Sequence, residues 1–178
     1  MTILRIRKYG DLILKKRCEM VRDEFNNIKR LIDDMFETMY ANLGIGLAAN
    51  QVGVLKRVIV TDVGTEGARK PIYLINPEII EMDGEEILEE GCLSLPEIKG
   101  EVKRKKRVFV RGLDTEGKVV KIDTIGILAR AIQHEIDHLD GILFIDRMDK
   151  NQKKALSLRL NKLRKATKRE LRSLSEGK

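Results

Sequence analysis

Apolar residues recur at helical spacing in two stretches of the chain. In the first, Phe25 to Tyr40, they fall every three or four residues, and Gly44 follows just past the end. In the second, from about Ile125 to Leu139, the same spacing runs up to Asp140-Gly141. Because one helical turn takes 3.6 residues, this spacing gathers the apolar side chains on one face. The pattern therefore predicts two amphipathic helices, each followed by a glycine near its end.

Between these stretches the chain has short runs of β-branched or aromatic residues, separated by Gly, Pro and Asp. Such runs are typical of strands, and the separators favour turns. After Met148, leucines recur at heptad-like intervals among Lys and Arg, which predicts a further helix. The predicted fold class is α+β, with short antiparallel strands around a buried helix and an appended C-terminal helix. The expected strands are 58–60, 72–75, 79–80, 108–110 and 119–122.

The charge of the chain is concentrated at its end. The sequence has 178 residues, which is the length of one globular domain, and its net charge is +7. Residues 149–178 hold 11 Lys and Arg against three Asp and Glu, whereas residues 1–148 hold 24 against 25. We therefore expect a single near-neutral domain over 1–148 and a basic C-terminal helix or tail over 149–178.

Several classes of protein are disfavoured by composition. No window approaches about 18 consecutive apolar residues, so no membrane span is expected. The first residues do not resemble a secretory signal peptide. Two cysteines, Cys18 and Cys92, are too few for a disulfide framework. A reducing, cytoplasmic compartment is the expectation.

The strongest chemical signal is a histidine pair inside the second predicted helix. His134 and His138 are the two histidines of the chain, with Glu135 between them. Residues four apart lie on one helix face, so both rings can bind one metal ion while Glu135 lies beside it. A catalytic metal site usually has three protein ligands and an open position, so a third ligand is needed. The candidates are Cys92, Asp140, Asp146 and Asp149.

Three segments, in this order along the chain, resemble the motifs of peptide deformylases. The segments are Gly44–Gln51 (GIGLAANQ), Glu90–Ser94 (EGCLS) and Gln133–Gly141 (QHEIDHLDG). The resemblance covers about residues 3–148, and Leu93 makes the chain similar to the bacterial type I branch. Two positions depart from the family pattern: Leu12 stands where proline is frequent, and Arg130 takes a position that is often apolar in the substrate pocket.

The resemblance implies a metal-dependent hydrolase that removes the formyl group from the N-terminal formyl-methionine of nascent polypeptides. It implies Cys92, His134 and His138 as the ligands of one metal ion per chain. The implied working ion is Fe²⁺, which Zn²⁺, Ni²⁺ or Co²⁺ can replace in purified protein. One thiolate and two imidazoles suit several of these ions, so the motif alone does not choose between them.

The resemblance also implies the roles of the other motif residues. Glu135 is expected to act as general acid/base, taking a proton from water and passing one to the leaving amine. The Gln51 side-chain amide and the Leu93 backbone N–H are expected to stabilise the oxyanion. Glu90 is expected to form an ion pair with Arg104 that supports the Cys92 segment.

The family binds its substrate as an extra strand along the first motif, with the methionine side chain in an apolar slot. Small residues there let the peptide backbone come close. On the residues alone, the apolar members of the implied set are more often ordinary core. The implied substrate-binding residues are Ile45, Gly46, Leu88, Gly91, Ile127 and Ala131.

Two interpretations of the basic tail remain open. By resemblance, residues 149–178 would dock on the ribosome, with Lys and Arg facing rRNA phosphates. Alternatively, the helix packs its leucines on the body and keeps its charges in water. The expected partners are thus formyl-Met nascent peptides and the ribosome, with no membrane and no sequence-specific nucleic acid.

Two rival functions share the metal-binding pattern. A zinc endopeptidase has the same helix motif but cleaves internal peptide bonds. A metal-stabilised RNA-binding module would use Cys92, His134 and His138 only as structural ligands. Replacement of Glu135 by Gln separates a hydrolase from such a module, because only the hydrolase loses turnover while keeping its metal.

Overall fold

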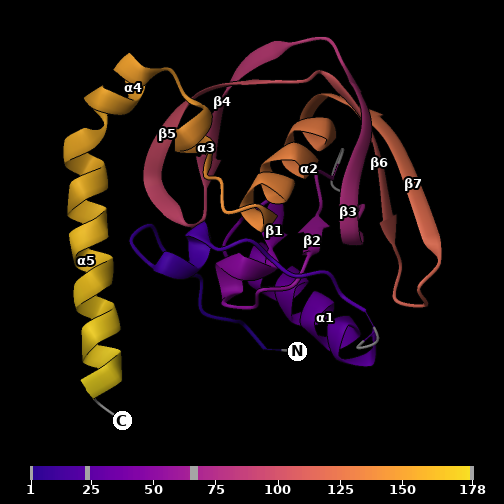
Figure 1. Cartoon of the computed structure of the whole chain (residues 1–178), viewed down its shortest axis with the longest axis horizontal. Helices are drawn as coiled ribbons and strands as arrows, with labels where there is room; N and C mark the ends of the chain where they lie inside the picture. The colour runs from indigo at the N-terminus through magenta and orange to yellow at the C-terminus, as the bar shows by residue number, and fades with distance from the viewer. Residues whose placement is uncertain (1, 23–24, 65–67, 177–178) are drawn as a thin grey trace.

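The computed structural model describes residues 2–22, 25–64 and 68–176, so the last two residues of the predicted tail lie outside the described residues. Its helices and strands are shown in Figure 1. The α-helices are α1 (Phe25–Ala41), α2 (Gly126–Leu139), α3 (Phe144–Arg147), α4 (Lys150–Ala155) and α5 (Ser157–Glu176), with 3-10 helices η1 (Leu12–Lys15) and η2 (Ala49–Val52). The strands are β1 (Gly46–Ala48), β2 (Val58–Thr61), β3 (Ile72–Asp83), β4 (Glu86–Cys92), β5 (Leu95–Arg104), β6 (Arg107–Leu113) and β7 (Val119–Ile125).

The strands form two antiparallel sheets with α2 between them. One sheet has the order β1-β2-β3-β6-β7, and β4 and β5 form a separate two-stranded sheet. Figure 1 shows α2 in the middle of the molecule, with β4 and β5 on one side and β6 and β7 on the other. The predicted α+β class, with antiparallel strands around a buried helix and a C-terminal helix, is confirmed.

Helices cover the larger sheet on both faces at its centre. Val58 and Val60 pack with α1, whereas Ile59, between them, packs with α2. Every position of β2 is therefore buried, which explains the unbroken apolar run over residues 58–60. At the edge of the sheet β7 has one covered face, and Val120 and Ile122 alternate with exposed neighbours. The alternation follows because successive side chains of a strand point to opposite faces.

The β4–β5 hairpin and the short strand β1 are the strands that the apolar pattern does not predict. Half-buried strands can carry charge on their outer face, and β4 has the sequence EILEEGC. Leu95, Ile98 and Val102 of β5 face a buried cluster that also includes Phe144. The predicted runs 72–75 and 79–80 are one strand, β3, whose pairing with β6 shifts register on either side of Ile79.

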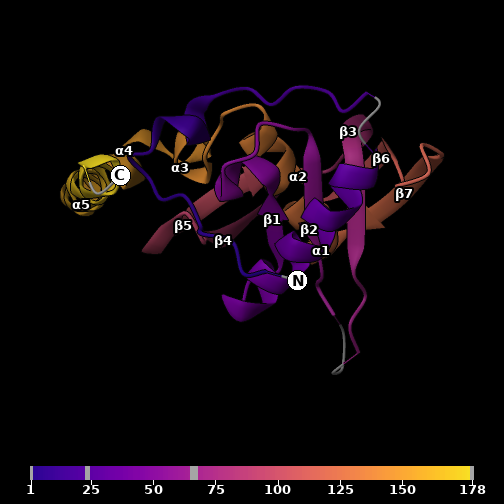
Figure 2. The same cartoon turned by 90° about the horizontal axis from the view of Figure 1, so that it is seen from below.

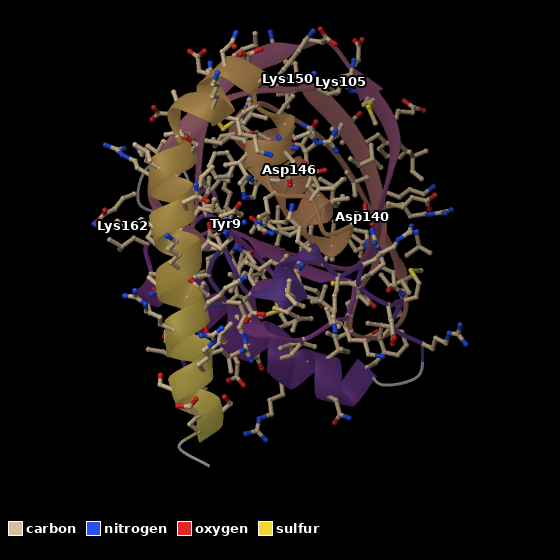
Figure 3. The ribbon with its side chains drawn as sticks, turned by 60° about the vertical axis from the view of Figure 1, so that its left-hand side comes forward. Tyr9, Lys105, Asp140, Asp146, Lys150 and Lys162 are labelled. Atoms are coloured by element: carbon tan, nitrogen blue, oxygen red, sulfur yellow. The ribbon has the colours of Figure 1, made fainter. Side chains whose placement is uncertain are left out.

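The C-terminal helix α5 packs against the body at the side opposite β7 (Figures 1 and 2). Leu160 is 5% exposed and belongs to the same cluster as Phe144, whereas Leu158 is 82% exposed. A Cβ atom on Gly10 would lie 2.9 Å from the Arg164 carbonyl oxygen, so the N-terminal segment contacts the helix closely. Figure 3 labels Lys162 on α5 and Tyr9 beside the helix. No helix of the described residues is long and apolar enough to cross a membrane.

Candidate metal centre

Two imidazoles and one thiol converge at the centre of the molecule. His134 and His138 lie one turn apart on α2, which is buried from Ala129 to Leu139. Cys92, the last residue of β4, places its Sγ 3.2 Å from Nε2 of His138. The three side chains can offer ligand atoms that all lie within 4.8 Å of one another. The hairpin thus brings the thiol to the histidine pair across more than forty residues.

The donor set fits a divalent transition metal. Nδ1 of His134 is 2.9 Å from Glu90 Oε2, which leaves Nε2 of that ring for a ligand bond. Two N–H groups, the Ser94 backbone N and the Gln51 Nε2, each lie 3.4 Å from Cys92 Sγ and suit a thiolate. One sulfur and two nitrogens leave a fourth position open in a tetrahedral arrangement.

The three aspartates considered as a third ligand are engaged elsewhere. Asp140 accepts a 2.7 Å hydrogen bond from Arg57, and Asp149 caps α4 by accepting from the Asn151 backbone N. Asp146 forms ion pairs with lysines of η1 and α4. Among the described residues, Cys92, His134 and His138 are the group of metal-binding side chains that converges.

The two imidazoles differ in their electrostatic environment. Burial lowers the pKa of both rings, and for His138 it holds the pKa well below the usual range. For His134, burial is outweighed by hydrogen bonds with Cys92 and Glu90, which raise its pKa well above the usual range. Because metal ligands must be deprotonated, metal binding at His134 is coupled to proton release.

Glu135 lies beside the ligands with a free carboxylate oxygen. Its side chain is buried, its Oε2 has no hydrogen-bond partner, and burial raises the pKa of Glu135 to about 7. The other oxygen, Oε1, lies against Gly46, where a Cβ atom would come within 2.5 Å of it. Gly46 therefore makes room for the carboxylate, a role that the sequence pattern did not indicate.

Gln51 and Leu93 are both placed at the same cavity. The Gln51 Oε1 accepts a 2.8 Å hydrogen bond from the Ala48 backbone N, and its Nε2 donates to Ser94 Oγ at 3.1 Å. The same Nε2 also lies 3.4 Å from Cys92 Sγ, so the amide nitrogen of Gln51 faces the metal-binding thiol. Leu93 lies in the turn between β4 and β5 and lines the cavity.

The cavity has a volume of about 640 Å³ and extends from the metal-binding side chains to the surface. Leu88 does not line it: this residue lies on β4 and is 43% exposed. The apolar pattern missed several lining residues of β5, among them Leu95, Pro96 and Ile98, because it did not predict that strand. The predicted substrate-binding residues that do line it are Ile45, Gly46, Gly91, Ile127 and Ala131.

Glu90 is surrounded by three donors. Arg104 donates from Nε and Nη2 at 2.9 and 3.0 Å, and Arg130 donates from Nη1 at 2.7 Å. The His134 ring is the third. Burial alone would raise the pKa of Glu90, but the hydrogen bonds from His134 and Arg104 lower it to about 2. The carboxylate is therefore ionised, and the contact from Arg130 is one that sequence reasoning missed.

Comparisons with known proteins find close likeness over most of the chain. The profile of a family described as Polypeptide deformylase matches residues 3–154. A peptide deformylase of Thermodesulfovibrio yellowstonii is 56% identical over 149 residues, which cover 83% of this chain and 90% of that protein. A solved peptide deformylase from Thermotoga maritima has a TM-score of 0.79 at 47% identity, covering 84% of this chain and 99% of that one. The plant peptide deformylase PDF1B has a TM-score of 0.90 at 37% identity, covering 96% and 94%.

Proposed function

This chain belongs to the peptide deformylase family of metallohydrolases, and from that premise we propose how its residues remove the formyl group from the N-terminal formyl-methionine of nascent polypeptides. The observation that carries the proposal is the approach of Cys92 Sγ to the histidine pair, beside the free oxygen of Glu135. Family membership favours this reaction over internal peptide cleavage and over a purely structural metal site.

In this proposal Cys92 Sγ, the Nε2 of His134 and the Nε2 of His138 hold one metal ion. When bound, the ion supplies Lewis acidity, which makes hydroxide available near neutral pH. We assign Fe²⁺ as the working ion on the family resemblance, with Zn²⁺, Ni²⁺ or Co²⁺ as replacements, since the donor set suits each of them. Glu90 fixes the tautomer of His134, because its Oε2 takes up the Nδ1 side of the ring.

Glu135 moves the proton. Its Oε2 accepts a proton from the attacking water and then passes one to the nitrogen of the leaving amine, so that formate and a free N-terminus result. Negative charge develops on the formyl oxygen during the attack. Nε2 of Gln51 and the backbone N–H of Leu93 donate to that oxygen, and loss of one such donor typically costs about 10²–10³ in rate.

The substrate peptide lies along Ile45 and Gly46 on one side and Gly91 on the other, as an added strand. The methionine side chain enters the cavity toward Ile127 and Ala131. Leu88, which does not line the cavity, is left out of this slot. Because nascent chains are the substrates, the proposal places the enzyme in the cytoplasm.

The proposal is tested by Glu135→Gln in a formate-release assay on formyl-Met-Ala-Ser. The variant keeps the three metal ligands but cannot take up the proton, so we expect kcat to fall by at least about 10³ at unchanged metal content. Wild-type protein should release formate and leave internal peptide bonds intact. A Glu135→Gln enzyme with undiminished turnover would contradict the assigned role.

A further inference from the structure

We propose that Arg130 is a positioning residue of the metal centre, which holds Glu90 and, through Glu90, the ring of His134. The inference rests on the metal site proposed above and extends it by one residue. Arg130 lies on α2 among residues that line the cavity, and its side chain is 5% exposed. A buried arginine needs partners for its donors, and the identity of those partners indicates what it does.

The guanidinium of Arg130 joins three segments of the chain. Nη1 donates to Glu90 Oε1 at 2.7 Å and to the Val102 carbonyl oxygen at 3.0 Å. Nη2 donates to the Glu86 carbonyl oxygen at 2.9 Å. The side chain thus ties α2 to both strands of the hairpin that ends in Cys92.

Arg104 also holds Glu90, through two hydrogen bonds, but its guanidinium is shared with a second carboxylate. Its Nη1 bonds Asp137, which also accepts from Arg147 at 2.6 and 3.1 Å. Arg104 therefore lies between two buried acids, whereas Arg130 pairs at 2.7 Å with Glu90 and only at 3.9 Å with the carboxylate of Glu86. Arg130 meets the Glu90 oxygen that faces away from the metal ligand, and the opposite oxygen bonds His134.

This arrangement fixes one orientation of the His134 ring. With Oε1 held by Arg130 and Arg104, the Glu90 carboxylate cannot rotate without breaking charged hydrogen bonds. Its Oε2 then stays against Nδ1 of His134, and Nε2 stays directed toward the other ligands. Outer partners of metal ligands commonly change metal affinity or activity by about 10- to 100-fold when they are removed.

The experiment measures Co²⁺ affinity by chelator competition, together with the thiolate-to-cobalt absorption of the full-length protein. In Arg130→Met we expect Co²⁺ to bind about 10- to 100-fold more weakly, with an altered absorption spectrum. Arg147→Met is the matched control: it removes an arginine from the same network that contacts Asp137 but not Glu90. We expect Arg147→Met to bind Co²⁺ as the wild type does, even where urea unfolding of the metal-free protein shows lower stability.

Arg130→Lys separates positioning from a merely structural clamp. Lysine keeps a cation beside Glu90 but lacks the planar fork that also reaches the Val102 and Glu86 carbonyl oxygens. Because the proposal assigns positioning to the charged contact with Glu90, we expect the Co²⁺ affinity of Arg130→Lys to stay within about threefold of the wild type. If Arg130→Met does not fold, Arg130→Lys decides: a tenfold or greater loss in Co²⁺ affinity overturns the proposal. Equal losses in Arg130→Met and Arg147→Met, or no loss in Arg130→Met, also overturn it. Absence of cobalt–thiolate absorption in the wild type would instead contradict the proposed metal site itself.

Discussion

Gly46 shows how a single hydrogen in place of a side chain supports the chemistry. Its α-carbon faces Glu135, and a Cβ atom there would lie 2.5 Å from Oε1 and 3.1 Å from Cδ of that carboxylate. A contact of this length forces the carboxylate to move, because real Cβ contacts are longer. At the residue scale, Gly46 and Glu135 therefore behave as one unit.

Substitution of Gly46 by Ala should lower kcat by about 100-fold, since a displacement near 1 Å of a reacting group has effects of this size. Metal content should not change, because the three ligands are untouched. Steady-state kinetics with formate detection measure the effect. In a double-mutant cycle with Glu135→Gln the penalty should disappear; an equal penalty in both backgrounds would place the role of Gly46 in peptide binding instead.

The two cysteines should differ in a second residue-level test. Cys92→Ala removes a side chain that is proposed to bind the metal directly, so it should weaken Co²⁺ binding by more than about 100-fold. Removal of a residue that only hydrogen-bonds to a metal ligand usually has a smaller effect. Cys18 is buried but does not belong to the converging group of ligands, and burial raises the pKa of its thiol to about 11. Cys18→Ala should therefore bind Co²⁺ normally. Metal analysis after gel filtration compares the two variants, and a metal-replete Cys92→Ala protein would contradict the ligand assignment.

At the scale of elements, Asp146 links three short helices near the metal centre. Its carboxylate, on α3, pairs with Lys15 of η1 and with Lys153 of α4 and accepts from the Leu143 backbone N. Burial alone would raise the pKa of Asp146, but these lysines and the backbone bond lower it. A lowered pKa in the folded state means that ionised Asp146 stabilises the fold.

Asp146→Asn should therefore lower the free energy of unfolding by about 1 kcal/mol at pH 7, as partly exposed charge pairs typically contribute. The stabilising contribution is present above the ordinary aspartate pKa and is lost as the pH falls through the folded-state value. Urea unfolding at pH 7 and at pH 3 should thus show a difference between the two proteins that shrinks in acid. A difference that grows toward pH 3 would contradict the sign of the shift.

The packing of α5 gives a second test at this scale. Leu160 is 5% exposed in the cluster around Phe144, whereas Leu158, two residues before it, is 82% exposed. Leu160→Ala should destabilise the protein by about 2–4 kcal/mol, and Leu158→Ala by no more than about 0.5 kcal/mol. Equal urea midpoints for the two variants would show that the helix is not docked in solution.

At the scale of the whole molecule, the charge of the chain is gathered on one side. The helix that carries it packs through Leu160 and Thr167 and leaves Lys162, Lys165 and Lys168 exposed. The two interpretations of the tail are therefore compatible: its apolar side contacts the body while its basic side faces solvent. We propose that this basic side contacts ribosomal RNA.

Replacing Lys162, Lys165 and Lys168 by Gln should weaken co-sedimentation with ribosomes and lower the slope of log K against log salt by about 2. The matched control replaces three exposed lysines elsewhere, at 106, 118 and 121, with the same loss of net charge. Sedimentation at two salt concentrations measures both variants. Equal weakening in the two would indicate a general charge effect without a docking surface on α5.

The sequence by itself determined the features that depend on neighbours along the chain. The spacing of His134, Glu135 and His138 fixes their common helix face, because the period of a helix is local. The boundaries of α1 and α2 follow their apolar periodicity within one or two residues, for the same reason. The pattern also indicated an α+β fold, since β-branched runs and helical runs are distinct along the chain.

Only the tertiary structure decided which distant segments meet. The Cys92 Sγ reaches His138 because the β4–β5 hairpin folds back over α2, and the charged sequence of β4 did not reveal that strand. The meeting of Arg130 with Glu90, and the position of Leu88 outside the cavity, depend on the same docking. Such contacts are set by how whole elements pack, and packing depends on shape and burial across many residues, which local periodicity does not record.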